Sequence, residues 1–388
     1  MFFHTIKLER MIKGIKACFF DIDAIKLRKI EAEFKKSWMI NKRKLSASEA
    51  FCSASFQVFL PNMNYKDHHK NFMKVFFNSS LAKYERLNFK LIDTINDEDF
   101  VFPNTDKGFI IAGFHYGSYH LISSYLIKNN KKFIVAVNET VAVKKNIIDE
   151  SNKGLQEYKK AHPSIDIEEI QYLSVQDELF VFKAKELLNE GFILLMFVDG
   201  NSGLDGIMKF ESKNRVELSF MGQVVKVKYG LPSLSYAFNV PILPVISTRI
   251  RKNKMKITSF DLIHPDRSMS REDFSKSSII NIYKILEKVV KANPLEWDGW
   301  LYIHRWLDIT NLKATENQSN TNKKLKKLKF NSKKYAFFSL GENNFLLDKN
   351  THLSYEIDAD ITDVIFSKNV TKCNRTIIQN CIEKNILI

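Results

Sequence analysis

Apolar side chains recur at intervals of three and four residues through the first ninety positions of the chain. The pattern is clearest in residues 25–44, "IKLRKIEAEFKKSWMINKRK", and in residues 65–87, "YKDHHKNFMKVFFNSSLAKYERL". This spacing places the apolar side chains on one face of a helix. We therefore predict a helical region over residues 1–92 that packs on the core of the protein.

From about residue 107, short apolar runs alternate with helical stretches. Four runs have the length and composition of buried strands: "GFIIAGF" (108–114), "KFIVAVN" (132–138), "FILLMFVDGN" (192–201) and "VPILPVISTRI" (240–250). Helical spacing lies between and after them, at 118–130, 175–191, 229–239 and 279–293. This alternation is typical of an α/β fold. We predict a mixed, largely parallel sheet flanked by helices over residues 93–310.

The pattern changes again near the C-terminus. Residues 311–330 are polar, and five lysines crowd into 323–329, which indicates a basic linker. Beyond it, short strands with turns at Gly341 and at Lys349–Asn350 precede two helical stretches. We predict a small α+β domain over residues 331–388, with a winged-helix-like content.

The charge balance suggests acidic partners. The chain of 388 residues carries a formal net charge of +15, which favours nucleic acid, anionic lipid headgroups or an acidic carrier protein. The alternative is a chain-wide abundance of lysine with no functional meaning. A nucleic-acid partner is disfavoured because the small C-terminal domain shows no recognition helix rich in Arg, Asn or Gln.

Cysteine usage and hydropathy bound the cellular location. The four cysteines are scattered, without a CxxC pair, which argues against a zinc site and a disulfide framework and suits a reducing cytosol. No run approaches the roughly 18–20 apolar residues that span a bilayer. The first twenty residues form a basic amphipathic stretch, which fits either the inner face of the cell membrane or packing on its own domain. We expect a cytoplasmic protein with peripheral membrane contact as a further option.

A candidate catalytic residue, His115, stands where the first predicted strand meets the following helix. Gly113 and Gly117 leave room for a substrate close to the backbone. Ser118 is placed to cap the helix, whose first amides favour developing negative charge. A neutral imidazole at this corner would take a proton from a hydroxyl or amine that attacks an acyl carbon. The alternative is a structural histidine.

Four motifs in order resemble the acyltransferases that add secondary acyl chains to lipid A, within the lysophospholipid acyltransferase superfamily. The first is "HYGSYH" at 115–120, which resembles a signature of His and an acid with four residues between them. The second is the strand that ends in Asp199-Gly200. The third is the strand with Val240, Pro241, Ile242 and Pro244, and the last contains Pro294, Trp297, Trp300, His304, Arg305 and Trp306. The likeness spans about residues 20–308.

The resemblance implies transfer of a fatty acyl group from acyl carrier protein or coenzyme A to a hydroxyl or amine, without a metal or cofactor. His115 would be the general base. Gly117, Ser118 and Tyr119 would contact substrate, with amides near Gly117 and Ser118 available to the oxyanion. In the family an acid orients the imidazole and stabilises its charged form.

His120 occupies the position of that acid. A neutral imidazole can accept a hydrogen bond from the His115 ring, but it does not stabilise a positive charge as a carboxylate does. We therefore expect a weaker base, a compensating acid from elsewhere, or an inactive site. Asp199, at the carboxyl end of the third strand, is the leading candidate for compensation, and a loop-capping role is its alternative.

Three basic residues are candidates for binding an anionic substrate group. Arg305 has the planar fork that suits a phosphate, although it also belongs to a stretch of packed tryptophans. Lys226 and Lys228 alternate with valines and so share one face of an extended segment. That face lines either a binding entrance or open solvent.

The C-terminal domain weakly resembles the peptide chaperone of pyrroloquinoline quinone biosynthesis and related leader-peptide recognition domains. The matching stretch is "NTHLSYEIDADITDVIFS…TIIQNCIEKNILI". Three hypotheses follow. The acceptor is a lipid or glycolipid, or it is a ribosomally made peptide recruited by residues 331–388. In the third, the protein is a degenerate acyltransferase that binds acyl chains or peptides.

Overall fold

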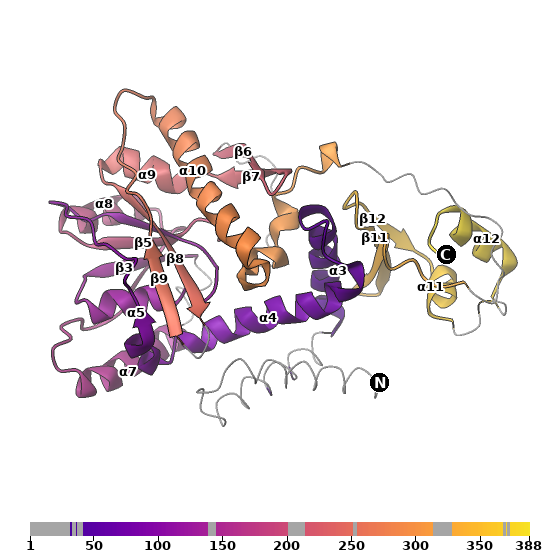
Figure 1. Cartoon of the computed structure of the whole chain (residues 1–388), viewed down its shortest axis with the longest axis horizontal. Coiled ribbons are helices and arrows are strands. Elements are labelled where there is room, and N and C mark those ends of the chain that lie inside the picture. Colours follow the sequence, from indigo (N-terminus) through magenta and orange to yellow (C-terminus); the bar gives the residue numbers. More distant parts are fainter. Residues whose placement is uncertain are drawn as a thin grey trace. The chain divides into compact units, whose positions relative to one another are not determined.

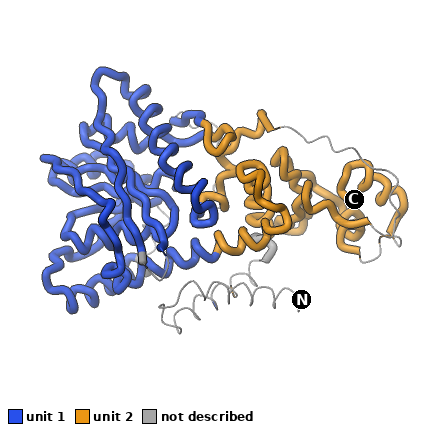
Figure 2. Tube along the Cα trace, viewed as in Figure 1, with its two compact units in different colours: residues 1–32, 77–218, 226–298 blue, residues 33–76, 219–225, 299–388 orange. Residues whose placement is uncertain are grey.

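The computed structural model describes residues 32, 36, 42–138, 145–200, 214–250, 254–312, 328–367, 370 and 373–388. The first twenty residues, most of the helix predicted at 25–44 and most of the linker predicted at 311–330 lie outside them. The chain divides into two compact units (Figure 2). Among the described residues, unit 1 takes residue 32 and those within 77–218 and 226–298, and unit 2 takes those within 33–76, 219–225 and 299–388. Unlike the predicted boundaries, this division groups residues 42–76 with the C-terminal region.

Unit 1 is built on a seven-stranded sheet in the order β1-β9-β8-β2-β5-β3-β4 (Figure 1). All neighbouring strands run parallel except β8 and β9, which are antiparallel. The predicted α/β fold with a mixed, largely parallel sheet is confirmed. The strands are β1 (Ile95–Asn96), β2 (Ile110–Gly113), β3 (Phe133–Val137), β4 (Gln171–Ser174), β5 (Ile193–Phe197), β8 (Ile242–Ile250) and β9 (Lys254–Ser259).

The central strands are apolar because both faces of the sheet are covered. All four residues of β2 are buried, and β2 pairs on one side with β5 and on the other with β8. A parallel strand in this position reads as a continuous hydrophobic run, which is why the four predicted strands were recognisable. The short edge strands β1 and β4 and the Lys-containing β9 carry no such run and were not predicted.

Helices alternate with the strands of unit 1 along the chain. Helices α5, α8, α9 and α10 fall within the predicted helical stretches, or overlap them. Helix α10 starts at Ser270, whose hydroxyl accepts a hydrogen bond from the Asp273 amide and satisfies a free donor of the first turn. The helices are α5 (Leu121–Lys128), α7 (Lys145–Ala161), α8 (Phe180–Asn189), α9 (Gly230–Phe238) and α10 (Arg271–Ala292), with the 3-10 helices η2 (Phe89–Thr94) and η3 (Pro294–Glu296).

Unit 2 contains a three-stranded antiparallel sheet in the order β10-β11-β12. Its strands alternate: Phe338 and Leu347 pack on helix α3 beside Ala50 and Ala54, while Leu346 packs on the other face with α11 and α12. The predicted strands, turns and two helices of the C-terminal domain are observed. The elements are α3 (Lys42–Phe59), η1 (Tyr65–Asp67), β10 (Tyr335–Leu340), β11 (Asn343–Asp348), β12 (Ser354–Ile357), α11 (Ala359–Phe366) and α12 (Arg375–Glu383).

The division between the two units falls inside some elements. Helix α4 (His68–Glu85) and the hairpin of β6 (Arg215–Phe220) and β7 (Gln223–Lys228) each contribute residues to both units. Three short 3-10 turns follow η3, namely η4 (Asp298–Leu301), η5 (Ile303–Arg305) and η6 (Ile309–Asn311). In the described part of the chain, no helix has the length and apolar character that crossing a bilayer requires.

Candidate functional site

Two neighbouring strands bring His115 and Asp199 together. Strands β2 and β5 are parallel, and Gly113 at the end of one pairs with Phe197 at the end of the other. His115 and Asp199 each lie two residues beyond these ends. They therefore meet at the carboxyl edge of the sheet, although 84 positions separate them along the chain.

The Asp199 carboxylate accepts hydrogen bonds from three donors. The His115 ring donates through Nδ1 to Oδ1 at 2.9 Å, and the His115 amide lies 3.0 and 3.1 Å from the two oxygens. The Trp297 indole Nε1–H donates to Oδ2 at 2.8 Å. Asp199 has no exposed surface, so these bonds replace water around a buried charge. They also fix the orientation of the imidazole.

A short backbone pairing positions Trp297 at this carboxylate. The Gly117 amide donates to the Glu296 carbonyl at 2.9 Å, and the Asp298 amide donates to the His115 carbonyl at 2.9 Å. Tyr116 and Trp297 form an antiparallel bridge between these two bonds. Residues 296–298, which follow α10, thus pair with residues 115–117 through backbone hydrogen bonds.

The His115 ring has apolar neighbours but remains reachable. Its centroid lies 4.9 Å from that of Phe197 and 4.8 Å from that of Tyr119. The side chain is 25% exposed, so solvent reaches part of the ring. Because Nδ1 is bonded to Asp199, the free proton-accepting position is Nε2, which makes no hydrogen bond with any described residue. This is the arrangement that a general base requires.

Charges around His115 favour its protonated form. Burial lowers the pKa of His115, but Asp199 and Asp298 outweigh that effect, and the net shift is upward. Asp298 is buried, and burial raises its pKa to about 6, against the lowering effect of His115. Two carboxylates therefore favour the protonated form of the His115 ring.

His120 lies next to the site without joining it. The structure shows no hydrogen bond between His120 and His115, and the His115 Nδ1 is already bonded to Asp199. The His120 ring instead stacks obliquely on Tyr119, with centroids 4.3 Å apart. Burial, with Arg86 and His115 nearby, lowers the pKa of His120 well below its ordinary value. The hydrogen bond that a neutral His120 is able to accept from the His115 ring is therefore not formed, and Asp199 takes that place at Nδ1.

Gly117 and Ser118 are packed against strands β8 and β9. Gly117 has a φ of +59°, and a Cβ there would lie 2.4 Å from the Ser247 carbonyl oxygen, so only glycine fits. Ser118 has no exposed surface, and its hydroxyl contacts the Met255 sulfur rather than capping α5. The Gly117 amide is engaged by Glu296. The substrate and oxyanion contacts expected of these two residues stay predictions, and Tyr119 lies against the His115 ring.

The three basic candidates lie on the β6–β7 hairpin and in η5. Lys226 forms an ion pair with Glu217 across the β6–β7 hairpin at 3.3 Å. Lys228 is exposed, and Val225 and Val227 are buried, so the two lysines share the polar face of β7 as predicted. Arg305 is half-buried in η5 and belongs to unit 2.

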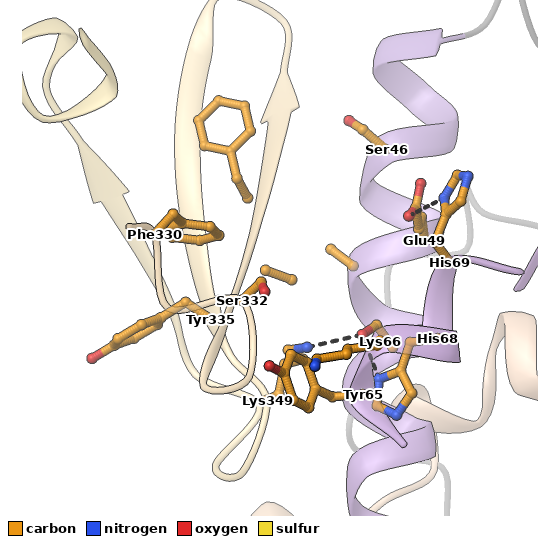
Figure 3. Close-up of a pocket in the computed structure, with 14 residues that line it drawn as sticks. Ser46, Glu49, Tyr65, Lys66, His68, His69, Phe330, Ser332, Tyr335 and Lys349 are labelled. Carbon is orange, nitrogen blue, oxygen red and sulfur yellow. Dashed lines mark hydrogen bonds and ion pairs between the residues drawn. The ribbon is translucent and has the colours of Figure 1, made fainter. Parts of the chain in front are cut away.

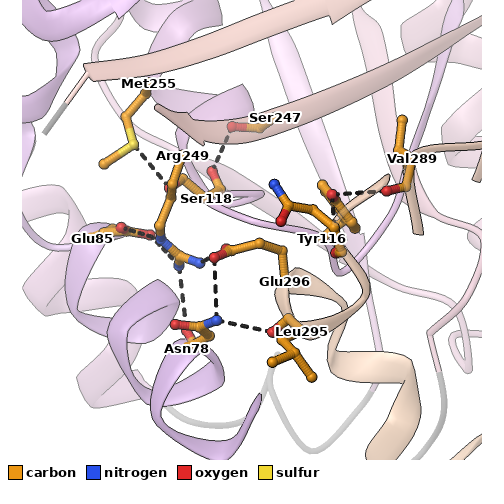
Figure 4. A network of polar contacts seen from close by, with 11 residues as sticks. Asn78, Glu85, Tyr116, Ser118, Ser247, Arg249, Met255, Val289, Leu295 and Glu296 are labelled. Carbon is orange, nitrogen blue, oxygen red and sulfur yellow. Dashed lines mark hydrogen bonds and ion pairs between the residues drawn. The ribbon is translucent and has the colours of Figure 1, made fainter. Parts of the chain in front are cut away.

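A buried ionic cluster beneath the site was not predicted (Figure 4). The Arg249 guanidinium, on β8, binds both oxygens of Glu85 at 2.9 Å and Glu296 at 2.6 Å, and also donates to the Asn78 carbonyl. Burial lowers the pKa of Arg249, but the two carboxylates reverse this and raise it. Since the Glu296 carbonyl holds the Gly117 amide, the cluster anchors the segment that carries Trp297 and Asp298.

The comparisons with known proteins add little. No protein-family model matches the chain, and no curated protein matches it. Among solved structures, the chain is similar to the 1-acyl-sn-glycerophosphate acyltransferase PlsC from Thermotoga maritima, with 16% identity and a TM-score of 0.33. The match covers 66% of this chain and 98% of that chain.

Proposed function

We propose that the protein is an acyltransferase that moves an acyl chain from a thioester donor to a hydroxyl or amine, with His115 as general base and Asp199 as its orienting acid. The observation that carries the proposal is the bond between His115 Nδ1 and the buried Asp199 carboxylate, which leaves Nε2 free on a partly exposed ring. The order of the sequence motifs supports the same reaction class.

The proton path follows from this geometry. Nε2 takes the proton of the acceptor as its oxygen or nitrogen bonds to the thioester carbonyl carbon. The positive imidazolium is stabilised by Asp199 at 2.9 Å and by the nearby Asp298. When the carbon–sulfur bond breaks, the thiolate takes the proton back from Nε2. The base is thus regenerated with every turnover.

Acyl carrier protein or coenzyme A is the donor most consistent with the chain. Both are acidic, and the protein has a formal net charge of +15. The rings of Phe197 and Tyr119 give the imidazole an apolar setting that suits an acyl chain. We place the reaction at the cytoplasmic side, where such donors are made.

Two acceptor classes remain in the proposal. The likeness of the motifs to those of lipid A acyltransferases favours a lipid or glycolipid. A peptide acceptor is supported by β12, which forms an edge of the small sheet and exposes Ser354, Tyr355 and Glu356. An extended peptide pairs readily with an open edge of this kind.

Purified protein incubated with radiolabelled acyl carrier thioester and a cell extract tests the proposal. We expect labelled product, and mass spectrometry of lipid and peptide fractions identifies the acceptor. Tyr355→Glu, at an exposed position of the edge strand β12, is expected to impair a peptide product selectively. If no acyl group is transferred or hydrolysed under any of these conditions, the protein is not an acyltransferase, and a binding role takes its place.

The pH dependence of transfer provides a second test. Because the base acts as neutral imidazole, kcat/KM is expected to rise with pH through a midpoint above 6.5, the ordinary histidine value, since the pKa of His115 is raised. Asp298→Asn removes a negative charge that favours the imidazolium, so the midpoint is expected to move to lower pH. The partly exposed carboxylate variant Asp177→Asn serves as control and should leave the midpoint in place. An unchanged midpoint in Asp298→Asn would remove His115 as the titrating group.

A further inference from the structure

A cavity of ≈ 410 Å³ lies within unit 2, between helix α3 and the small sheet (Figure 3). Its volume is that of a site for a small molecule. Polar side chains line it from α3, from η1 and α4, and from the end of β11, and aromatic side chains line it from the sheet. None of these residues belongs to the His115 site.

A lysine is buried in this wall. Lys349 follows β11 and is only 3% exposed. Its Nζ reaches toward α3 and donates a hydrogen bond to the Ser53 hydroxyl at 3.2 Å. Ser53 in turn lies 2.9 Å from Nδ1 of His68. Because the ammonium has only donors, Ser53 accepts from Lys349 and donates to an unprotonated His68.

The pKa values of His68 and Lys349 agree with this direction of the two hydrogen bonds. Burial and the Lys349 charge lower the pKa of His68 to about 4, so His68 is neutral at physiological pH. Burial lowers the pKa of Lys349 to about 8, against a raising effect of Glu49, so the lysine remains largely charged. Glu49 itself is bonded to His69 at 2.7 Å.

Lys349 therefore has unused hydrogen-bonding capacity. An ammonium has three N–H donors, and Ser53 is the single side-chain acceptor that the described residues supply. No carboxylate among those residues lies within ion-pair distance of it. A buried ammonium without a counter-ion is costly, and a ligand with a negative group would remove that cost.

We propose that the cavity binds a small organic monocarboxylate, whose carboxylate contacts Lys349 and whose apolar part lies against the aromatic wall. The wall contains Phe330, Tyr335 and Phe337. Two lysines, Lys349 and the exposed Lys66, and one carboxylate, Glu49, line the cavity. This balance of one excess positive charge suits a single negative charge better than the double charge of a phosphate monoester.

Calorimetric titration of the full chain with octanoate and with 3-phenylpropanoate tests the proposal. We expect saturable binding of at least one of them, and none of the corresponding amides, which lack the charge. Lys349→Met is expected to weaken binding by about tenfold or more, as for loss of a hydrogen bond to a charged group. Ser332→Trp, which places a large side chain at an exposed position of the cavity lining, should also weaken it without altering Lys349.

Controls separate binding from folding. Lys74→Met removes an exposed lysine of α4 and should leave affinity unchanged. Thermal unfolding without ligand is expected to show Lys349→Met at least as stable as the parent, since an uncompensated buried charge is removed. Binding of octyl phosphate in preference to octanoate would overturn the monocarboxylate assignment. Absence of binding to either acid, or equal affinity in Lys349→Met, would overturn the site. None of these readouts depends on acyl transfer.

Discussion

His115→Ala is expected to lower the rate of acyl transfer by about 10²–10⁴-fold, the usual contribution of a general base. Asp199→Asn should cost a loss of similar size for a different reason. An asparagine in place of Asp199 offers one acceptor oxygen and one NH₂ group to the donors that now surround the carboxylate. If the NH₂ faces the ring, Nδ1 must become the acceptor and the proton moves to Nε2, which then has no free lone pair for the substrate.

The double variant shows whether the two residues act as one unit. If Asp199 works only through His115, combining both changes should cost no more than His115→Ala alone. Single-turnover rates with the acyl donor measure this directly. His120→Asn is the matched control, and its rate should stay within about threefold of the parent, because His120 makes no hydrogen bond to His115. Additive losses from His115 and Asp199, or an equally inactive His120→Asn, would contradict the assignment.

The sequence predicted the main strands of unit 1 because buried parallel strands are continuous apolar runs. It did not give their order. Chain order alone suggests that the strand at 132–138 neighbours that at 108–114, yet β5 lies between β2 and β3. That insertion is what brings Asp199 to His115. From the sequence, Asp199 is one candidate for the acid that His120 replaces. Its contact with the imidazole follows only once β5 is known to lie next to β2.

The sequence does not reveal the role of residues whose partners lie far away along the chain. The sequence around Trp297 indicates a packing residue, since nothing local reveals that its indole N–H binds a carboxylate 98 positions away. Asp298 was overlooked beside it. Arg249 stands near the end of a predicted strand, where an arginine is normally exposed, and its burial depends on Glu85 and Glu296 from other elements.

The surroundings of Gly117 and Ser118 differ from what the composition of the turn suggests. A glycine-rich turn before a helix suggests open amides for an anion. In the structure the Gly117 amide is taken by the Glu296 carbonyl, and Ser118 faces the interior. Turn composition indicates backbone geometry, but it does not indicate which other segment of the chain covers the turn.

Arg249→Met is expected to destabilise the protein by about 3–5 kcal/mol, the cost of breaking a buried ion pair by removing one partner. The side chain is only 6% exposed, and its loss leaves the buried Glu85 and the partly buried Glu296 without their cation. Urea unfolding measures the change. Glu85→Gln in the same background should recover part of the loss, because one of the two uncompensated charges is then removed.

The Arg249→Met loss should also depend on pH in a definite direction. Burial already raises the pKa of Glu85, against the lowering effect of Arg249, so without the arginine the folded-state pKa rises further above its unfolded value. The folded variant then binds more protons than the unfolded chain, and its stability increases as pH falls. The loss of stability in Arg249→Met is therefore expected to be smaller at pH 5 than at pH 8.

Lys276→Met, which breaks the exposed pair with Glu272 at 2.5 Å, should leave the unfolding midpoint in place at both pH values. A deficit for Arg249→Met that is equal at the two pH values would mean that the lost packing of the side chain, rather than its charge, holds this part of unit 1 together.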